Sequence, residues 1–385
     1  MRKTRKRGEK TARISLQRCG GYDSEKVFKA VKKAIDDLGG IDRFVKKGDR
    51  VLLKPNLLVS SRVDKHVTTH PEVVRATLKL VKKAGGKPSI GDSPALGSAV
   101  KVAAKCGIAD VAREEGVEVI NFNRPIDIDN PAGAQFKKFK IDEAIRDADV
   151  VINLPKLKTH GQMTLTMSVK NMFGSIPGTR KTQWHLSAGT DRMHFARMLV
   201  DLCHKVSPQV TIMDAIVGMQ GNGPQNGDAK KIGLVMAAED PVALDVVASE
   251  IVGLRRDKML TTVAAEEMGI GCTDPEDMSI GGESVEDCKI GGFVFPMVVD
   301  IMSLFPWFLR NPLRDWLTSR PVVDRQKCEL CMVCANSCPA RVITAKNDKL
   351  QFDLKQCIRC FCCQEMCPQG AITVGAGPLA KALRL

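Results

Sequence analysis

Nine of the fourteen cysteines lie within forty residues, between Cys328 and Cys367. They form two units with the spacing C-x2-C-x2-C-x3-C-P, and the first cysteines of the two units are 29 positions apart. Three thiolates at this spacing bind one face of an iron–sulfur cubane, while the fourth, displaced by the proline, ligates a neighbouring cluster. The repeat therefore predicts two [4Fe-4S] clusters with exchanged fourth ligands: Cys328, Cys331, Cys334 and Cys367 on one, and Cys357, Cys360, Cys363 and Cys338 on the other.

Structural zinc is the alternative for paired C-x2-C units, because zinc also takes four thiolates. Zinc has no use for the third regularly spaced cysteine or for a Cys-Pro ending in both units, so iron–sulfur chemistry is favoured. Cys362 departs from the repeat, since Val333 is its counterpart, and we interpret it as a spare buried thiol. Over roughly fifty residues the repeat resembles bacterial-type two-cluster ferredoxins.

A second set of polar residues lies earlier in the chain, mostly just after short apolar runs. Lys54, Lys156 and Lys158 are expected to make a cationic rim suited to a carboxylate or phosphate. Crowding of like charges can also depress the pKa of one lysine and make it a base or nucleophile. His70 and His160 are the candidate proton donors, because each stands at an expected turn beside polar groups. The candidate substrate-binding residues are Asn56, Asp92, Lys170, Asn171 and Asp214.

For each of these residues alone, a cap, a turn or a solvated charge is the structural alternative, and Asp240 and Ser93-Pro94 are interpreted as helix N-caps. The functional interpretation requires these side chains to come together in the folded protein. In open α/β sheets ligands bind outside the carboxyl ends of the strands, where such side chains meet.

The elements that must position these residues follow from periodicity. From Ala12 to about Gly282, short β-branched runs alternate with helical patterns, which predicts an α/β domain with a mostly parallel sheet flanked by helices. Thr69 to Glu72 is interpreted as a capping box before a helix that ends at Gly85, and Asp240 is expected to cap a second helix. The expected strands are Ala12–Leu16, Arg50–Leu53, Lys87–Gly91, Val117–Asn121, Val150–Leu154, Gln209–Met213 and Ile232–Ala237.

The predicted organisation has five parts. The cysteine repeat is expected to form a small α+β two-cluster ferredoxin-like domain, separated from the α/β domain near Arg320. The parts are a basic disordered tail (1–11), the α/β domain (12–290), an apolar connector (291–320), the ferredoxin-like domain (321–375) and a C-terminal tail (376–385).

Composition limits the class of protein. A mean hydropathy of −0.10 and a charged fraction of 26% are typical of a globular protein and do not fit disorder or collagen. The apolar stretch 291–316 is interrupted by prolines and an aspartate before it reaches spanning length, so we predict no transmembrane helix there, with contact to a membrane surface as an alternative. Exposed cluster cysteines and scattered single thiols favour a reducing, cytoplasmic setting.

Two further features of the sequence are typical of nucleotide-binding or nucleic-acid-binding proteins. Gly218 to Gly223 is similar to a glycine-rich phosphate loop, but it opens no helix and precedes Pro224, so a Rossmann site is not predicted. The net charge of +14 suggests a polyanion partner, yet six basic groups lie in the first ten residues and no aromatic interleaving accompanies them. Nucleic acid is therefore not expected as a partner.

The α/β part also resembles a prokaryotic family defined as a domain of unknown function and often fused to a ferredoxin module. The strings that carry the resemblance are VLLKPNLL, TTHPEVVRAT, GDSP, NLPKLKTHGQMTLTMSVKNMFG, DAIVGMQGNGP and DPVALDVVASEIVG. The resemblance implies this two-part architecture and an iron–sulfur cofactor, and it implies no substrate.

Two functions are consistent with these observations. In the first, the protein is an iron–sulfur redox protein whose ferredoxin module passes electrons to or from a site in the α/β domain that binds an anionic or carbonyl-bearing substrate. In the second, it is an electron-transfer or cluster-carrying subunit whose α/β domain docks a partner protein. A charged pocket near Lys156 to His160 would favour the enzyme, and a flat apolar patch beside the clusters would favour docking.

Overall fold

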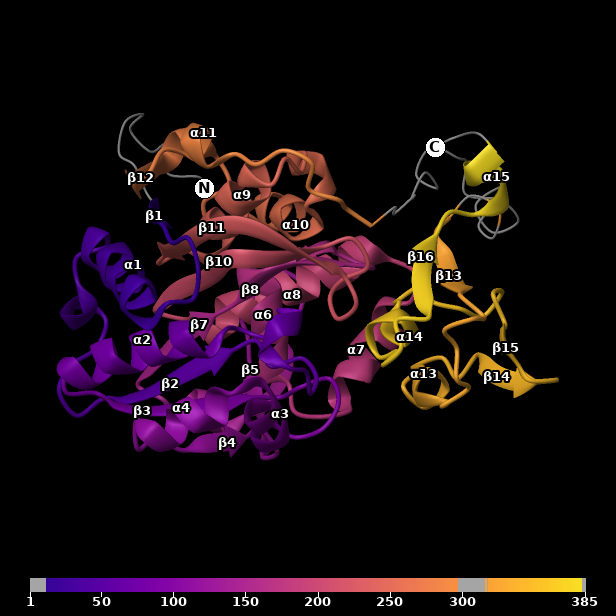
Figure 1. Ribbon diagram of the computed structural model, residues 1–385, viewed down its shortest axis with the longest axis horizontal. Helices are drawn as coiled ribbons and strands as arrows, with labels where there is room; N and C mark the ends of the chain where they lie inside the picture. Colours follow the sequence, from indigo (N-terminus) through magenta and orange to yellow (C-terminus); the bar gives the residue numbers. More distant parts are fainter. Residues whose placement is uncertain (1–11, 297–315, 317, 383–385) are drawn as a thin grey trace.

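The apolar runs build one large mixed sheet. The computed structural model describes residues 12–296, 316 and 318–382, in which ten strands join in this sheet (Figure 1). The order of its main path is β12-β1-β11-β10-β7-β2-β3-β4, with β8 and β9 added beside β10. The strands are β1 (Ala12–Arg18), β2 (Arg50–Pro55), β3 (Lys87–Asp92), β4 (Val119–Asn121), β7 (Val150–Leu154), β8 (Lys156–His160), β9 (Thr164–Thr166), β10 (Val210–Gln220), β11 (Asp228–Ala238) and β12 (Met278–Gly282).

Six strand pairs are parallel, and β11 runs antiparallel between β1 and β10. All seven expected strands are present and the predicted fold class is confirmed. Strand ends differ by at most four residues from those expected, except that β10 ends at Gln220 rather than Met213. Two expectations about where strands begin and end were wrong. Lys156 to His160 was expected to follow a strand, with a turn at His160, but is itself strand β8. Asp214 was expected just after a strand but lies inside β10, because β10 continues to Gln220 beside β11 and β8.

Helices cover both faces of the sheet because successive strand residues point to opposite sides. Val51 and Leu53 pack with one set of helices and Leu52 packs with the other. The first set is α1 (Ser24–Asp37), α2 (Pro71–Lys83), α3 (Ala99–Cys106) and α4 (Ile108–Glu114). The second set is α6 (Ser168–Asn171), α8 (Arg192–Val206), α9 (Pro241–Ile251) and α10 (Leu260–Met268). The remaining elements are the hairpin β5 (Pro125–Asp129) and β6 (Lys138–Asp142), with α5 (Glu143–Asp147), α7 (Arg180–Ala188) and α11 (Val285–Cys288).

Three capping residues test the expected helix starts. Asp240 caps α9 as predicted, by accepting the N–H groups of the first turn. The capping residue of α2 is His70 rather than Thr69, whose hydroxyl instead donates to the carbonyl of Leu154. Ser93 caps no helix, because α3 begins only after Ser98. Ser93 is therefore available for another role.

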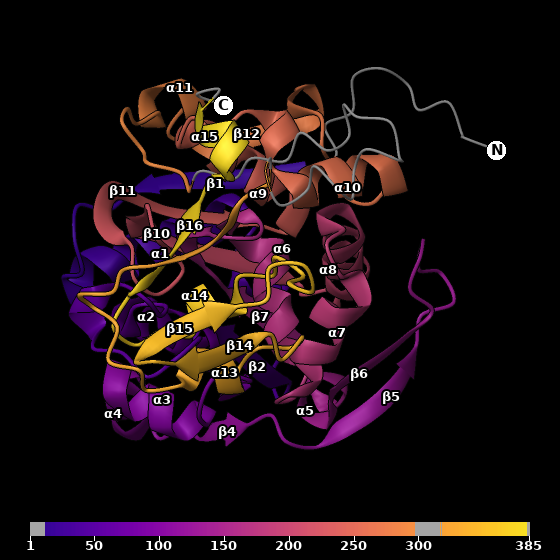
Figure 2. The same cartoon turned by 90° about the vertical axis from the view of Figure 1, so that its right-hand side faces the viewer.

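The second unit is small. It consists of the strand pairs β13 (Arg320–Val323) with β16 (Ile372–Gly375) and β14 (Ile343–Lys346) with β15 (Lys349–Phe352), plus α13 (Val333–Asn336) and α14 (Cys362–Glu365). Figure 2 shows the β14 and β15 pair in front of the larger domain. Helix α15 (Pro378–Ala382) follows. The buried residues of this unit include five of its cysteines, so metal centres are expected to contribute much of its core.

The ferredoxin-like unit docks through α14 onto the loop between β10 and β11. The amide of Gln364 donates to the backbone oxygens of Asn222 and Gly223, and Asn226 donates to the carbonyl of Cys367 at 2.9 Å. Gly161 allows this approach, because a Cβ there would lie 3.0 to 3.2 Å from atoms of the ferredoxin-like unit. The glycine-rich motif that begins at Gly218 thus belongs to the interface between the two units.

Predictions for residues 1–11, for most of the 291–320 connector, including any membrane-surface contact, and for residues 383–385 lie outside the described residues. Within the described part of the chain, no helix is both long and apolar enough to cross a membrane.

Candidate functional site

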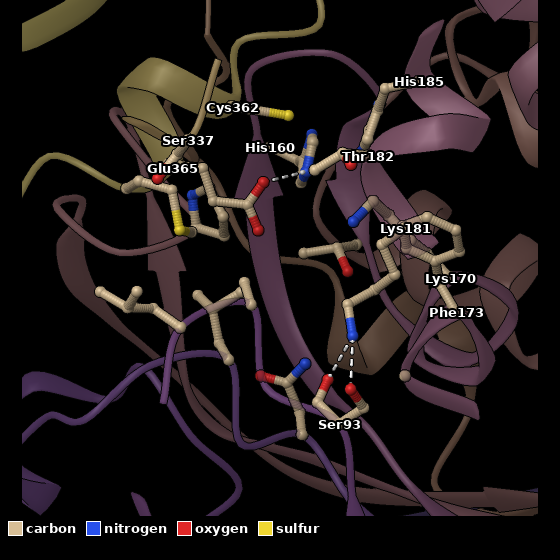
Figure 3. A pocket seen from close by; sticks show the side chains of 18 of the residues that line it. Ser93, His160, Lys170, Phe173, Lys181, Thr182, His185, Ser337, Cys362 and Glu365 are labelled. Atoms are coloured by element: carbon tan, nitrogen blue, oxygen red, sulfur yellow. Dashed lines mark hydrogen bonds and ion pairs between the residues drawn. The ribbon is translucent and has the colours of Figure 1, made fainter. Parts of the chain in front are cut away.

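A pocket of about 320 Å³ lies where the two units meet. Its walls come from the loops after β2 and β3, from β8, α6 and α7, and from α13 and α14 of the ferredoxin-like unit (Figure 3). The polar and charged lining residues are Asn56, Asp92, Ser93, Lys158, His160, Thr166, Lys170, Asn171, Thr179, Lys181, Thr182, His185, Asn336, Ser337, Cys362 and Glu365. The pocket therefore joins residues from both units of the chain.

Strand β8 places three of the predicted residues in one row. Lys156, Lys158 and His160 are two positions apart, so their side chains lie on the same face of the strand. All three are buried, and each has a different environment along the row. Only Lys158 and His160 line the pocket.

Lys156 belongs to a separate polar centre. Its ammonium lies 2.7 Å from both the Asp214 carboxylate and the Tyr22 hydroxyl. The His70 ring stacks on Tyr22 with centroids 3.6 Å apart, and its Nδ1 accepts the N–H of Glu72. The structure thus brings Lys156, Asp214 and His70 together, but apart from the pocket lining.

Lys54 and Asp92 form an ion pair at the edge of the pocket. Their charged atoms are 2.8 Å apart and both side chains are buried. The second Asp92 oxygen accepts the N–H of Leu57 at 2.9 Å, so this pair holds the loop after β2. Asp92 lines the pocket, whereas Lys54 does not.

A chain of amides positions Lys158. Asn171 donates to Asn153 at 2.8 Å and accepts from Asn56 at 3.1 Å. The oxygen of Asn56 in turn accepts from the Lys158 ammonium at 2.8 Å, and the carbonyl of Val67 accepts from it at 2.6 Å. Asn56, Asn171 and Lys158, which were predicted as site residues, therefore do meet.

The pocket ammonium groups have lowered pKa values. Burial lowers the pKa of Lys158 to about 7. The positive charge of Lys170 lowers this pKa further, whereas the negative charge of Glu365 raises it. Burial likewise lowers the pKa of Lys181 to about 8, although its ammonium donates to both oxygens of Ser93 at 2.7 and 2.9 Å. The pKa of Lys170 is also lowered by burial, and no described residue accepts a hydrogen bond from it. Lys170 is left facing the pocket without a hydrogen-bonding partner among the described residues.

His160 has a defined tautomer. Its Nδ1 accepts the N–H groups of Gln162 and Met163 at 3.0 and 3.2 Å, so in the neutral ring the proton is on Nε2. Burial lowers the pKa of His160 to about 4, which makes the ring neutral near pH 7. Nε2 lies 3.6 Å from a carboxylate oxygen of Glu365 and has no closer partner in the described residues. Its N–H is therefore directed at Glu365, a residue that also lines the pocket.

Two further groups complete this end of the pocket. Burial lowers the pKa of His185 to about 3, and its buried Nδ1 has no hydrogen-bond partner among the described residues. Burial alone would raise the pKa of Glu365, but the contact with His160 and the charge of Lys170 outweigh it, so the net shift is downward. Glu365 is therefore an anion beside two neutral imidazoles and an ammonium.

Four residues of the pocket were not predicted as site residues from the sequence: Ser93, Lys181, His185 and Glu365. Lys181 and His185 are four positions apart on one face of α7, a spacing that could have indicated a shared site. Glu365 gave no such signal, because its role depends on how the ferredoxin-like unit docks. Cys362 is buried, as predicted, and it also lines the pocket.

The cluster cysteines surround two smaller cavities. One is lined by Cys328, Cys331, Cys334 and Cys367. The other is lined by Cys338, Cys357, Cys360 and Cys363. Each set holds three cysteines of one unit and the last cysteine of the other, the grouping that the repeat predicts, and four thiolates suit an iron–sulfur cluster. The residues present therefore fit two clusters, and the ligation itself stays a prediction.

The fold and the cysteine cavities define a protein with an α/β domain joined to a ferredoxin-type iron–sulfur module. Residues 51–250 match the domain of unknown function DUF362, and residues 320–368 match the 4Fe-4S dicluster domain, which carries two clusters. The chain belongs to the DUF362 family.

Similar proteins are known. A thylakoid-associated protein of Synechocystis sp. is 41% identical over 266 residues, which are 68% of this chain and 81% of that protein. The lactate racemase apoprotein from Thermoanaerobacterium thermosaccharolyticum has a TM-score of 0.42 at 12% identity over 64% of this chain and 58% of its own. A Thermotoga maritima protein has a TM-score of 0.34 at 15% identity over 51% of each chain. This chain thus spans little more than half the length of either solved structure.

Proposed function

We propose that the protein is an iron–sulfur oxidoreductase that acts on a small anionic substrate bound in the pocket between the two units. The observation that carries this proposal is the composition of the pocket walls. One wall holds Lys158, Lys170 and Lys181 of the α/β domain, and the other holds Cys362, which lies between two cysteines of a cluster cavity. A substrate in this pocket is next to both cations and a cluster site.

The two cysteine sets that line the smaller cavities are the proposed cluster ligands. When bound, the two [4Fe-4S] clusters supply single electrons to the edge of the pocket. Cys331 is exposed in one set, whereas Cys360 and Cys363 are buried in the set beside the pocket. An external one-electron carrier protein is the proposed redox partner, because nothing in the chain itself is a net source of electrons.

The pocket residues have separable roles. Lys170 and Lys181 bind the anionic group of the substrate, since both ammonium groups line the pocket and lack a carboxylate partner within ion-pair distance in the described residues. His160 donates a hydrogen bond from Nε2 as a neutral imidazole. Lys158 is the proposed proton donor, because a pKa of about 7 is suited to proton transfer near neutral pH.

The reaction class is the reduction of a polarised double bond, or its reversal. Two electrons from the external carrier and two protons add across the bond, so that X=Y becomes HX–YH. One proton comes from the Lys158 ammonium and the other from solvent. The hydrogen bond from His160 stabilises the negative charge that develops on the reduced group.

Reoxidation of the reduced protein tests the proposal. The holoprotein, prepared without oxygen and reduced with dithionite, is mixed with a set of small carboxylates and phosphates that each carry a carbonyl or another polarised double bond, while cluster absorbance is recorded. At least one anion is expected to reoxidise the clusters, and Lys170→Met is expected to slow this reaction at least about tenfold, the loss of about 1.4 kcal/mol of transition-state binding. Lys205→Met, which removes an exposed lysine outside the pocket, is the matched control and should keep the wild-type rate.

Reoxidation by protein carriers but by no small anion would overturn the proposal. It would favour the electron-transfer subunit instead. Equal reoxidation rates in the wild type and Lys170→Met would also show that the reaction does not take place in this pocket. Iron analysis of each variant ensures that a slow rate does not result from lost clusters.

The proposed setting is the cytoplasm. Every described cysteine is free of disulfide bonds, and ferredoxin-type thiolate clusters are typical of reducing compartments. Fractionation of the native host would check this, and recovery of the protein in an oxidising compartment would contradict it.

A further inference from the structure

The pocket has two chemically different sides. Figure 3 shows Lys170 and Lys181 on one side, across from Glu365 and Ser337. The lining also includes a group of apolar side chains from the loops after β2 and β3, from the loop after β10 and from α14: Leu58, Ala95, Leu96, Pro224 and Met366. We propose that the substrate is a monocarboxylate with an apolar body, and this proposal rests on the function proposed above.

The charge of the pocket indicates a single negative charge on the substrate. Lys170 and Lys181 line the pocket with positively charged ammonium groups, and Lys158 adds a partial positive charge. The negative charge of Glu365 cancels about one of these positive charges. Asp92 is neutralised by its ion pair with Lys54. The lining side chains therefore leave only a small positive charge, which one carboxylate balances and a phosphomonoester dianion exceeds.

The apolar side is held in place by the backbone. Leu58 has a φ of 42°, a left-handed conformation that is unfavourable for a leucine. Two hydrogen bonds hold this loop: the N–H of Leu57 donates to Asp92 at 2.9 Å, and the N–H of Ala95 donates to the carbonyl of Leu58 at 2.7 Å. The two loops therefore form one wall, and Leu58 lines the pocket despite the conformational cost.

The burial of the lining residues orients the substrate. His160 and His185 are 1% and 6% exposed, so the polar groups around Glu365 lie at the floor. Leu96 lines the same pocket and is 50% exposed, so it lies at the rim. The carboxylate is therefore placed inside, near the ammonium groups, and the apolar body extends along Leu58 toward Leu96.

Equilibrium binding to the anaerobic holoprotein tests this assignment. Straight-chain carboxylates from acetate to octanoate are titrated, together with alcohols and alkyl phosphates of the same chain lengths. Carboxylate affinity is expected to rise about fourfold for each added methylene until the wall is covered, the fold-change that corresponds to about 0.8 kcal/mol per buried methylene. Alcohols should bind much more weakly, and alkyl phosphates should bind more weakly than carboxylates of equal length.

Two leucine variants locate the apolar side. Leu96→Ala is expected to reduce the gain per methylene for the longer carboxylates while acetate binds as in wild type. Leu379→Ala removes a leucine of similar exposure, 38%, that does not line the pocket, and it should leave the whole series unchanged.

The outcomes separate this inference from the proposed function. Carboxylates that bind with an affinity independent of chain length, or alkyl phosphates that bind more tightly, would overturn the monocarboxylate assignment and leave the anion site intact. No binding by any anion would overturn the assignment and the pocket's proposed role together.

Discussion

Among the pocket lysines with a stated pKa, Lys158 titrates closest to neutral pH, at about 7 against about 8 for Lys181. Its ammonium is held by Asn56 and the carbonyl of Val67, and burial lowers its pKa to about 7. If the ammonium form donates the proton, the anion-dependent reoxidation rate should fall about tenfold per pH unit above about pH 7, because the neutral amine then accumulates. Stopped-flow measurements across this pH range check the prediction.

The variant Lys158→Met should lower the rate by about 10²-fold or more and remove this pH dependence. Lys205→Met is again the control, because its lysine is exposed and outside the pocket. A fall above pH 7 that persists in Lys158→Met would assign the titration to another group.

The exchanged cluster ligands give a prediction about pairs of cysteines. Cys338 and Cys360 line the same cavity, whereas Cys331 lines the other. Replacing Cys338 and Cys360 together by serine should cost about four irons, no more than either change alone, while Cys338→Ser with Cys331→Ser should cost about eight. Anaerobic iron and sulfide analysis measures this difference.

Cys362→Ser is the matched control, since Cys362 lines neither cluster cavity and the variant should keep about eight irons. Additive losses for Cys338 with Cys360 would show that the last cysteine of each unit serves its own cluster.

At the scale of elements, α6 depends on one buried carboxylate. Asp245 of α9 accepts the N–H groups of Ser168 and Val169, at 2.7 and 3.0 Å, where α6 begins. The variant Asp245→Asn leaves one acceptor oxygen, so one buried N–H loses its partner at a cost of about 1–3 kcal/mol. We expect a lower unfolding temperature and weaker anion binding, because α6 carries Lys170.

Asp23→Asn provides the comparison for this prediction. Asp23 caps the exposed start of α1, and asparagine caps a helix about as well as aspartate. This variant should unfold and bind anions as wild type does. Unchanged anion binding in Asp245→Asn would show that α6 does not need this contact to position Lys170.

Strand β8 shows why part of the site could not be read from periodicity. Its sequence, KLKTH, is polar enough to be taken for a loop, because lysines are rarely buried. Here Lys156 is compensated by Asp214, and Lys158 is compensated by Asn56 and a carbonyl. These partners are distant in the sequence and meet the lysines only in the folded protein. The expectation that lysines are exposed is therefore wrong here.

At the scale of the whole molecule, the pocket exists only while the two units are docked. Gln364 donates to Asn222 O, Asn222 Oδ1 and Gly223 O at 3.0, 2.8 and 2.9 Å. The variant Gln364→Glu directs a carboxylate at these three oxygens, and an unpaired buried charge costs about 3–5 kcal/mol. We expect anion binding to be lost while the iron content is unchanged, as measured by titration and iron analysis.

The control is Gln351→Glu, which makes the same change at an exposed position of β15 and should bind anions normally. Wild-type anion affinity in Gln364→Glu would mean that the ferredoxin-like unit contributes no necessary wall to the pocket.

The sequence by itself determined the parts of this protein that depend on local spacing. Three ligands of each cluster are only a few residues apart, and the Cys-Pro ending of each unit marks the fourth, so the cysteine repeat predicts the two groups that line the cysteine cavities. Period-two and helical patterns are equally local, and they predicted the seven strands and the fold class.

Only the tertiary structure decided which charged residues share a site. Of the predicted lysines and histidines, Lys158, Lys170 and His160 line the pocket, whereas Lys156 and His70 contact Tyr22 outside it. Lys54 pairs with Asp92 at the pocket edge. Glu365, Lys181 and His185 join the pocket from two other helices, and Glu365 does so across the contact between the two units. Such groupings depend on docking free energies between distant segments, which leave no periodic trace in the sequence.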